Sequence, residues 1–428
     1  MGGVRVRSAG MLVLSLLGVL VVLGPTSTAV VDSDPAPPVR ASPEQDGRTT
    51  AVTDLLHRRA DAILRHDRAG FLATVDPAAT AQFAAAQRAL FDNLAGVPLA
   101  TWSYRVDPST VLSPLGGQAR DDVELWAPAV ELAYTLDGID GAPATEPMGY
   151  LFAKRGDRWY LTSDTGLSRQ TWRGPWDFGS VTTLRAASGL VLTHPRNLAL
   201  GRRVAAELDD DVAAVTAVWG RQWPQRVAVL LPDSTDELRA FVGAEFAVQT
   251  IAAVAVADSV DHDNRSATGQ RVVLNPNNAR KLSAASLRVV LRHELTHVAA
   301  RGVTVDGTPM WMLEGFADYV GYYGSGIAAT TVAPEVARLI DAGTPPRSLP
   351  ANSDFAASGG RIELAYQEAW TVTSYIAETF GQDALVRLYQ AVAGEDPSAS
   401  VDKALVSVIG VDQAELVRGW QKYLTQWL

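Results

Sequence analysis

The chain has 428 residues, a formal net charge of −10 and no cysteine. The acidic balance argues against nucleic acid as a partner, because binding phosphate groups needs a basic surface. The lack of cysteine excludes disulfides, thiolate metal ligands and a cysteine nucleophile, so a metal site must use His, Asp or Glu. At a prior of roughly 150 residues per domain we expect two or three packed domains.

Residues 1–29 have the pattern of an export signal. Arg5 and Arg7 form a basic start, an uncharged, mostly apolar run of 16 residues follows from Ala9 to Gly24, and Ser27 to Ala29 suit a cleavage site. A membrane span usually needs about 20 residues, so we predict cleavage, with an uncleaved membrane anchor as the alternative. Either way we expect the rest of the chain to be secreted or to lie on the outer face of the cytoplasmic membrane, attached only through this segment.

Residues 30–49 are rich in Pro, Ser and Asp and predict a flexible linker. Residues 50–178 show two helical patterns followed by short aromatic and β-branched segments separated by turns, and "KRGDRW" at Lys154 to Trp159 predicts a hairpin. This order predicts an α+β domain. Through "HDRAGFLATVD" and "DRWYL" the region resembles the NTF2-like proteins, which implies a small, cone-shaped α+β fold.

Residues 179–428 form the second predicted domain. A helix is expected from Arg196 to Trp223, and the polar segment between residues 259 and 270 is expected to be a solvated turn. Strands are predicted at "SGLVLTHP", "RVAVLLP", "AAVAVAD" and "RVVLNP".

The segment "VVLRHELTHVAARG" places His293 and His297 four residues apart, with Glu294 beside the first. Residues four apart share one face of a helix, so the two imidazoles can bind one Zn²⁺. Helix geometry turns Glu294 about 100° away from His293, which suits it to hold a water molecule rather than the metal. Ser283 or Ser286 is expected to cap this helix. A structural pair of helical histidines is the alternative.

A catalytic zinc site needs a third protein ligand and an open position. After a short turn, Thr308 is expected to cap a new helix and Pro309 to begin it. A short antiparallel return would bring Glu314 of this helix to the two histidines, and Asp318 would then orient a ligand histidine. The alternative for Glu314 is a surface carboxylate, but its neighbours in the sequence are mostly apolar.

The motifs "HELTH" and "WMLEGFADY" together resemble the gluzincin metallopeptidases, and most of all the peptidase MA-like group. The resemblance implies a thermolysin-like zincin domain, with a mixed sheet, the HExxH helix and a helical C-terminal part. Three ligands without cysteine suit one Zn²⁺ per chain. The implied roles are metal ligand for His293, His297 and Glu314, general base for Glu294, and support of a ligand for Asp318.

A donor for the oxyanion is also expected, and no histidine follows His297 to supply it. The resemblance implies a tyrosine at the start of a later helix, "RIELAYQEAWTVTSYIAETFG", which is expected to begin near Glu363. Tyr366 matches that position, with a role in packing alone as the alternative. Rival donors are Tyr319, Tyr322, Tyr323 and Arg361.

The predicted function is hydrolysis of peptide or protein substrates, with Glu294 taking a proton from a water molecule that the metal polarises. The aminopeptidase branch of the family has a G-x-M-E-N stretch, but the strand expected there, "RVVLNPNN", has no acidic residue, so we favour an endopeptidase. As an edge strand it could still bind an extended peptide through backbone hydrogen bonds. One alternative is a binding protein with negligible turnover on a metallopeptidase-like fold. Another is that the N-terminal domain is the active part and binds a small apolar ligand.

Overall fold

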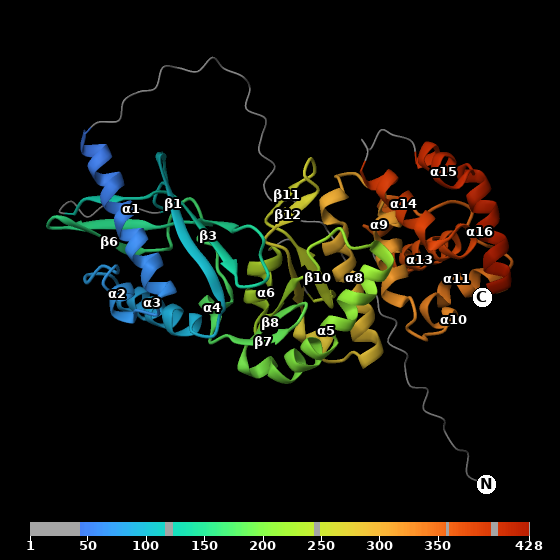
Figure 1. Ribbon diagram of the computed structural model, residues 1–428, viewed down its shortest axis with the longest axis horizontal. Helices are drawn as coiled ribbons and strands as arrows, with labels where there is room; N and C mark the ends of the chain where they lie inside the picture. The colour runs from blue at the N-terminus through green and yellow to red at the C-terminus, as the bar shows by residue number, and fades with distance from the viewer. Residues whose placement is uncertain (1–42, 116–122, 244–248, 357–358, 395–400, 428) are drawn as a thin grey trace, which may run out of the picture.

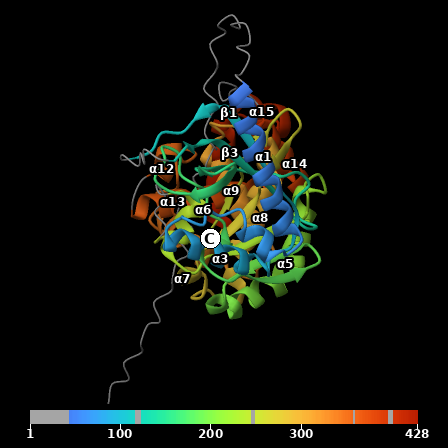
Figure 2. The same cartoon turned by 90° about the vertical axis from the view of Figure 1, so that its left-hand side faces the viewer.

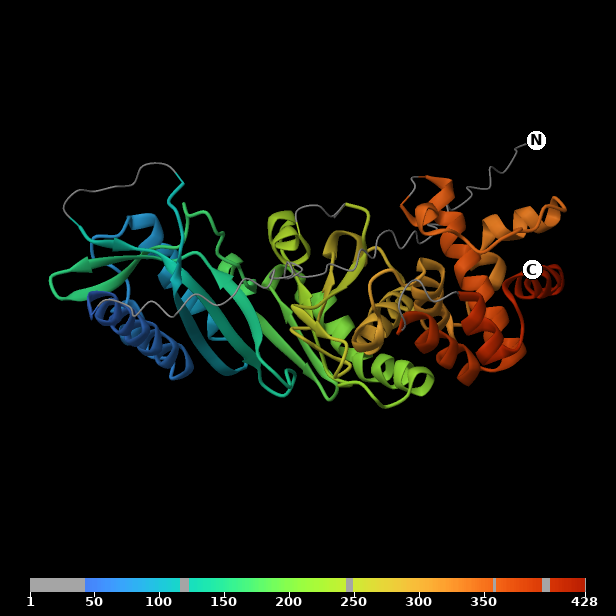
Figure 3. The same ribbon diagram turned by 90° about the horizontal axis from the view of Figure 1, so that it is seen from above.

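The computed structural model shows a mixed α+β protein whose parts follow one another along its longest axis (Figure 1). An N-terminal α+β part leads to a central sheet, and the last helices lie at the other end, as the view from above also shows (Figure 3). Among the described residues, no helix is both long and apolar enough to cross a membrane. The predicted export signal lies outside the described residues, which are 43–115, 123–243, 249–356, 359–394 and 401–427.

The N-terminal part packs helices against antiparallel strands. Its strands form two three-stranded sheets, in the orders β1-β3-β4 and β2-β5-β6, and α1 and β1 lie at the front of the end-on view (Figure 2). Lys154 to Trp159 form the predicted hairpin between β5 and β6. The elements are α1 (Pro43–Leu64), α2 (Arg68–Leu72), α3 (Ala81–Leu94), β1 (Leu99–Val111), β2 (Leu125–Trp126), β3 (Pro128–Leu136), β4 (Ala144–Met148), β5 (Leu151–Arg155), β6 (Arg158–Ser163) and α4 (Pro175–Phe178).

The predicted linker, residues 30–49, is too long by seven residues. Helix α1 begins at Pro43, because proline is accepted in the first turn of a helix and its missing N–H costs nothing there. The helical pattern that buries Val52 and Leu55 therefore extends further toward the N-terminus than its apolar residues indicate.

The central sheet has five strands in the order β10-β13-β9-β8-β7. Strands β8, β9 and β13 are parallel, whereas β7 and β10 pair antiparallel at the two edges. The segment from residue 259 to 270 was wrongly predicted as a simple turn, since β11 and β12 pair there as a ribbon. The elements are β7 (Thr182–Ala186), β8 (Gly189–Thr193), η1 (Pro195–Asn197), α5 (Leu198–Trp219), β9 (Val227–Leu231), α6 (Thr235–Val242), β10 (Ala253–Val256), β11 (Ser259–Asp261), β12 (Ser266–Thr268) and β13 (Arg271–Leu274).

The two faces of this sheet are buried by different parts of the chain. Val191 and Val229 belong to the core formed with α5 and the later helices, whereas their neighbours Leu190 and Leu230 belong to the core of the N-terminal part. Successive residues of a strand point to opposite faces, so the run of apolar residues in β8 and β9 fits a sheet covered on both sides.

The remaining helices complete the larger core. Helix α9 packs between α8 and α13. The helices are α7 (Pro276–Ala279), α8 (Ala284–Ala300), η2 (Arg301–Val303), α9 (Met310–Tyr322), α10 (Ala329–Val332), α11 (Pro334–Asp341), α12 (Asn352–Phe355), α13 (Gly360–Phe380), α14 (Gln382–Ala393), α15 (Val401–Ile409) and α16 (Gln413–Trp427).

Candidate metal centre

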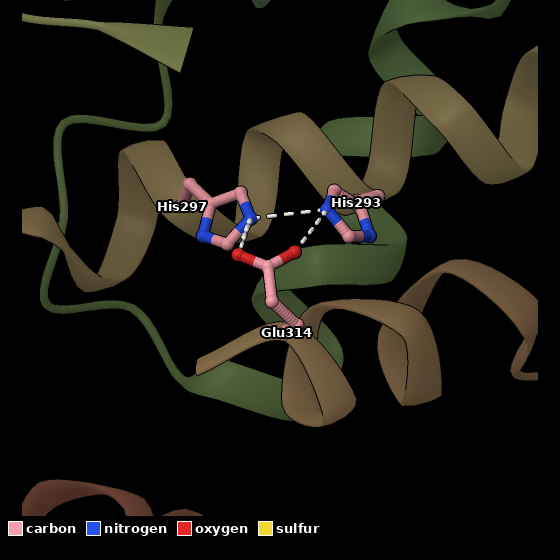
Figure 4. A group of neighbouring side chains, drawn as sticks. All are labelled: His293, His297 and Glu314. Carbon is pink, nitrogen blue, oxygen red and sulfur yellow. Dashed lines mark hydrogen bonds and ion pairs between the residues drawn. The ribbon is translucent and has the colours of Figure 1, made fainter. Parts of the chain in front are cut away.

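Helix α8 presents the two histidines from the core of the molecule. Ser283 caps the helix by accepting a hydrogen bond from the backbone N–H of Ser286, as predicted. Leu291 and Leu295 are fully buried on the face that packs in the core. The helix is thereby anchored along its length, and His293 and His297 project together from the side that meets α9 (Figure 4).

Glu314 reaches the histidines from α9, which returns after the 3-10 turn η2. The Nε2 atoms of His293 and His297 are 3.0 Å apart, and the carboxylate oxygens of Glu314 lie 3.4 Å and 3.9 Å from them (Figure 4). Thr308, however, was wrongly expected to cap α9. Its hydroxyl instead donates to the carbonyl of Val305, and α9 starts at Met310 after Pro309.

These donors fit a tetrahedral zinc ion. Zinc bonds of about 2.0–2.1 Å place neighbouring ligand atoms about 3.3 Å apart in a tetrahedron, close to the separations between these three side chains. His293 and Glu314 have no exposed surface, and neither carboxylate oxygen of Glu314 forms a hydrogen bond of normal geometry. A buried carboxylate without such partners is costly, and a cation removes that cost. Two imidazoles and one carboxylate are also the donor set of a catalytic zinc site.

Asp318 lies one turn after Glu314 and contacts the opposite side of the His293 ring. Its Oδ1 is 2.8 Å from Nδ1 of His293, so this nitrogen donates and Nε2 is left to face the other ligands. Burial alone would lower the pKa of His293, but the carboxylates of Asp318 and Glu314 outweigh it and raise that pKa. The structure therefore places Asp318 where the sequence expectation required it.

The pKa of His297 shifts the other way. Burial lowers it well below its ordinary value, and the charges of His293 and Arg301 lower it further. This shift favours the neutral form of His297, in which an imidazole binds a metal. Arg301 was not among the residues singled out from the sequence, although it follows His297 at the same interval of four residues.

Glu294 lies beside the three ligands without being one of them. Its side chain is fully buried, and neither of its oxygens forms a hydrogen bond of normal geometry within the protein. Burial raises its pKa to about 7, an effect that the charge of His293 opposes and that of Glu314 reinforces. The backbone N–H of Ala255, in strand β10, also interacts with this carboxyl and lowers the same pKa. A carboxyl that changes protonation near neutral pH can both take up and release a proton.

Tyr366 comes to this site from the first turns of α13, which begins at Gly360, three residues before the predicted start. Its hydroxyl lies close enough to Glu314 to lower the pKa of that carboxyl. Its ring packs on Phe355, with the centroids 5.2 Å apart. Both packing and a polar role at the metal centre are thus open to it.

The rival donors have other partners. Tyr319 accepts a hydrogen bond from Gln382, Tyr322 packs its ring on Trp370, and Tyr323 is largely exposed. Arg361 forms ion pairs with two carboxylates, those of Asp354 and Glu368.

The edge strand beside the site is not the expected one. "RVVLNP" forms β13, which is paired on both sides, by β9 and β10, and has no free edge. The edge belongs to β10, whose residues Ala253–Val256 include no carboxylate. The pairing partners of a strand depend on the whole sheet, which is why the sequence pattern of either strand left this open.

A comparison with protein families finds a match in the second half of the chain. Residues 278–426 match the model of the Peptidase MA superfamily, and this range includes α8, α9 and α13. The match supports a peptidase of the gluzincin type. A comparison with curated proteins gives no match.

Solved structures give distant likenesses. Native yeast LTA4 hydrolase has 11% identity and a TM-score of 0.36, over 68% of this chain and 49% of that one. A two-domain M1 zinc metallopeptidase mutant bound to L-arginine has 12% identity and a TM-score of 0.35, over 75% and 69%. An M1 zinc metallopeptidase mutant from Deinococcus radiodurans, bound to a Tyr-Ser-Ala substrate, has 13% identity and a TM-score of 0.32, over 74% of each chain. The present chain thus spans about half of the yeast protein, and none of these likenesses is close enough to transfer a function.

Proposed function

We propose that this protein is a zinc-dependent metallopeptidase. The observation that carries the proposal is the convergence of His293, His297 and Glu314 beside Glu294, with the carboxylates of both glutamates buried. The family match over residues 278–426 supports the same conclusion from the sequence. A fold that served only to bind a partner would gain nothing from burying an unsatisfied Glu294 next to three metal ligands.

Each side chain has one role in this proposal. His293, His297 and Glu314 would hold the ion, and Asp318 would orient His293. Zn²⁺, when bound, supplies a Lewis acid that polarises the substrate carbonyl and lowers the pKa of water toward about 7. Glu294 takes the proton of the attacking water and delivers it to the leaving amine. The Tyr366 hydroxyl donates to the oxygen that becomes negative at the scissile carbonyl.

Several finer features belong to the proposal. The stoichiometry is one Zn²⁺ per chain, because the described residues bring together a single such group of ligands. Cleavage is internal rather than at a free N-terminus, which is consistent with an edge strand β10 without a carboxylate. The catalytic part has a thermolysin-like arrangement, and the N-terminal part an NTF2-like one.

We also propose that the protein is exported, on the basis of the basic and apolar pattern of residues 1–29. The mature chain then starts near Val30 and works outside the cytoplasm. N-terminal sequencing of protein from culture medium and from membranes tests this. Mature protein beginning near Val30 is expected, and an intact Met1 in the membrane fraction supports an anchor instead.

The central test combines elemental analysis with digestion of a peptide library by the full chain. One zinc per chain and cleavage products are expected from the parent protein. His293→Ala and Glu314→Ala are expected to lose both the zinc and the cleavage, because each removes a ligand. Full zinc retention in both variants contradicts the ligand set. A zinc-loaded parent protein that cleaves no peptide contradicts the proposed activity.

A further inference from the structure

Arg301 is a largely buried cation at the end of α8. As a whole, the residue is only 9% exposed. Among the residues that the structure describes, none forms a hydrogen bond or an ion pair with its guanidinium. The nearest acidic residue that acts on its pKa is Asp306, which is exposed and forms no ion pair with it. Arginine stays charged in proteins, so a largely buried guanidinium needs solvent or a ligand to satisfy its donors.

This charge lies next to the metal centre. Arg301 continues the right-handed helical path of α8, with φ −53° and ψ −43°, and it follows His297 by four residues as His297 follows His293. Residues at this interval lie above one another on a helix face. After burial and the charge of His293, the charge of Arg301 also lowers the pKa of His297. It acts as well on Tyr389, whose pKa is raised by burial and also by the charge of Glu314. Both effects agree with the helix spacing, which places the guanidinium near the ligands.

Arg301 is also within reach of a molecule that reaches the metal. Of the three ligands, His293 and Glu314 have no exposed surface, whereas His297 keeps 8%, close to the 9% of Arg301. Among the three ligands, access to the centre is therefore at His297, the ligand one turn before Arg301. One helical turn separates them, about 6 Å along the axis.

We propose that Arg301 determines specificity by binding a carboxylate of the substrate close to the scissile bond. The inference rests on the proposed peptidase function and adds the chemistry of its preferred substrate. A guanidinium fits a carboxylate with two parallel hydrogen bonds, and a site from which water is largely excluded strengthens them. An extended peptide advances about 3.3–3.6 Å per residue, so the carboxylate belongs one or two residues from the cleaved bond.

Such a carboxylate has two sources. It is either an acidic side chain of the substrate or the free C-terminus of a substrate that ends shortly after the cleaved bond. Both carry the same group, and peptides that differ only in these features separate them. The set consists of a neutral peptide with an amidated C-terminus, the same peptide with a free C-terminus, and the amidated peptide with one acidic side chain near the cleaved bond.

Binding is measured by calorimetry on the zinc-loaded full chain with Glu294→Gln, so that no peptide is consumed. Adding Arg301→Gln is expected to weaken binding of one carboxylate peptide about ten- to a hundredfold relative to the neutral amide, the usual worth of hydrogen bonds between charged groups. The matched control is Arg387→Gln, at an exposed arginine on α14. It is expected to leave the affinity for the carboxylate peptides relative to the neutral amide unchanged. The proposal is overturned if Arg301→Gln weakens all three peptides equally, or none.

Folding of the variants is checked separately. Arg301→Met keeps the length of the side chain and removes the unpaired charge, so it is expected to fold and to melt no lower than the parent. It replaces Arg301→Gln in the binding test if the latter does not fold. A clear fall in its melting temperature assigns Arg301 to a structural role and overturns the proposal. Hydrolysis by the otherwise unchanged chain is measured on its own, so a missing peptidase activity is distinguished from a wrong specificity.

Discussion

At the scale of single residues, the metal centre gathers several buried ionisable groups. Glu294 and Glu314 are both fully buried, and their oxygens lack hydrogen bonds of normal geometry. Such groups destabilise a fold unless a ligand compensates for them. The two carboxylates nevertheless differ in their neighbours. Glu314 lies 3.4 Å and 3.9 Å from the two histidines, whereas Glu294 is not in the group of possible metal ligands among the described residues, and the proposed roles of ligand and base rest on this difference.

Glu294→Gln is expected to keep the fold and the zinc while hydrolysis falls by at least about 10²-fold, because the amide cannot accept the proton. Zinc content and peptide cleavage of the same preparation are the measurements. A variant that loses the metal but keeps activity contradicts the role of base.

Asp318→Asn is expected to lower zinc affinity about tenfold or more, because the residue would no longer hold the His293 Nδ1–H with a negative charge. Competition with a chelator measures the change. The control is Asp383→Asn, an exposed aspartate on α14. Equal affinities for both variants and the parent would remove Asp318 from the metal site.

Tyr366→Phe is expected to lower kcat about 10²–10³-fold, as for the loss of one oxyanion donor, with KM little changed and zinc retained. Steady-state kinetics on a peptide found in the library measure this. If the variant cleaves at the parent rate, Tyr366 serves packing on Phe355, and another residue is the donor.

At the scale of helices, the site depends on how closely α9 approaches its two neighbours. A Cβ atom on Gly315 would lie 2.4 Å from the carbonyl oxygen of Ala369 in α13. On the other side, a Cβ on Gly321 would lie 2.9 Å from the carbonyl oxygen of Val289 in α8. Thr373 adds a hydrogen bond of 2.8 Å to the carbonyl of Gly315. Glycine at these two positions lets α9 bring Glu314 to α8 and α13 at the same time.

Gly315→Ala is expected to lower the free energy of unfolding by about 1–3 kcal/mol, because backbone atoms must move to admit the methyl group. It is also expected to lower activity, since α13 carries Tyr366. Chemical denaturation and peptide cleavage are measured together. Gly360→Ala, in the first turn of α13 with open space around its Cβ, is the control and is expected to change neither.

At the scale of the whole molecule, the central sheet joins the N-terminal part to the metal centre. Arg271 of β13 pairs with Asp140 at 2.6 Å, and both side chains are almost fully buried. Next to this pair, Glu146 of β4 faces Asp258, which follows β10. The N-terminal part is therefore held to the strand that borders Glu294 by buried charges as well as by apolar packing.

This junction is expected to make stability depend on pH. Burial, and next the charge of Asp258, raise the pKa of Glu146 to about 9. Between the ordinary pKa near 4.5 and that value the folded chain binds more protons than the unfolded chain. Stability therefore falls as pH rises through this window, by at most about 1.4 kcal/mol per unit.

Glu146→Gln is expected to make this slope shallower by the contribution of Glu146, because the amide stays neutral at every pH and can still donate to Asp258. Unfolding free energies at pH 5 and pH 8 measure it. Glu124→Gln, an exposed glutamate in the same part of the molecule, is the control and is expected to keep the slope of the parent. A parent protein that is equally stable at both pH values would contradict the shift.

The local features of this protein were readable in its sequence. Caps, turn residues and the period of apolar residues act between neighbours in the chain, so they predicted the Ser283 cap, the β5–β6 hairpin and the order of strands and helices around the "HELTH" segment. The interval of four residues also placed His293 and His297 on one face before any tertiary structure was known. The proximity of Glu314 to the histidines could be predicted only by assuming that the chain returns antiparallel after a short turn. The role of Tyr366 was predicted only from the family resemblance.

What only the tertiary structure decided depends on contacts between distant segments. It made β10 rather than β13 the edge strand, because pairing is a property of the whole sheet. It removed water from Glu294 and raised its pKa, since burial comes from helices and strands that no local pattern locates. It also left Arg301 without an ion pair to any residue that the structure describes: a sequence shows that a charge is present, but only the fold determines whether another charge can reach it.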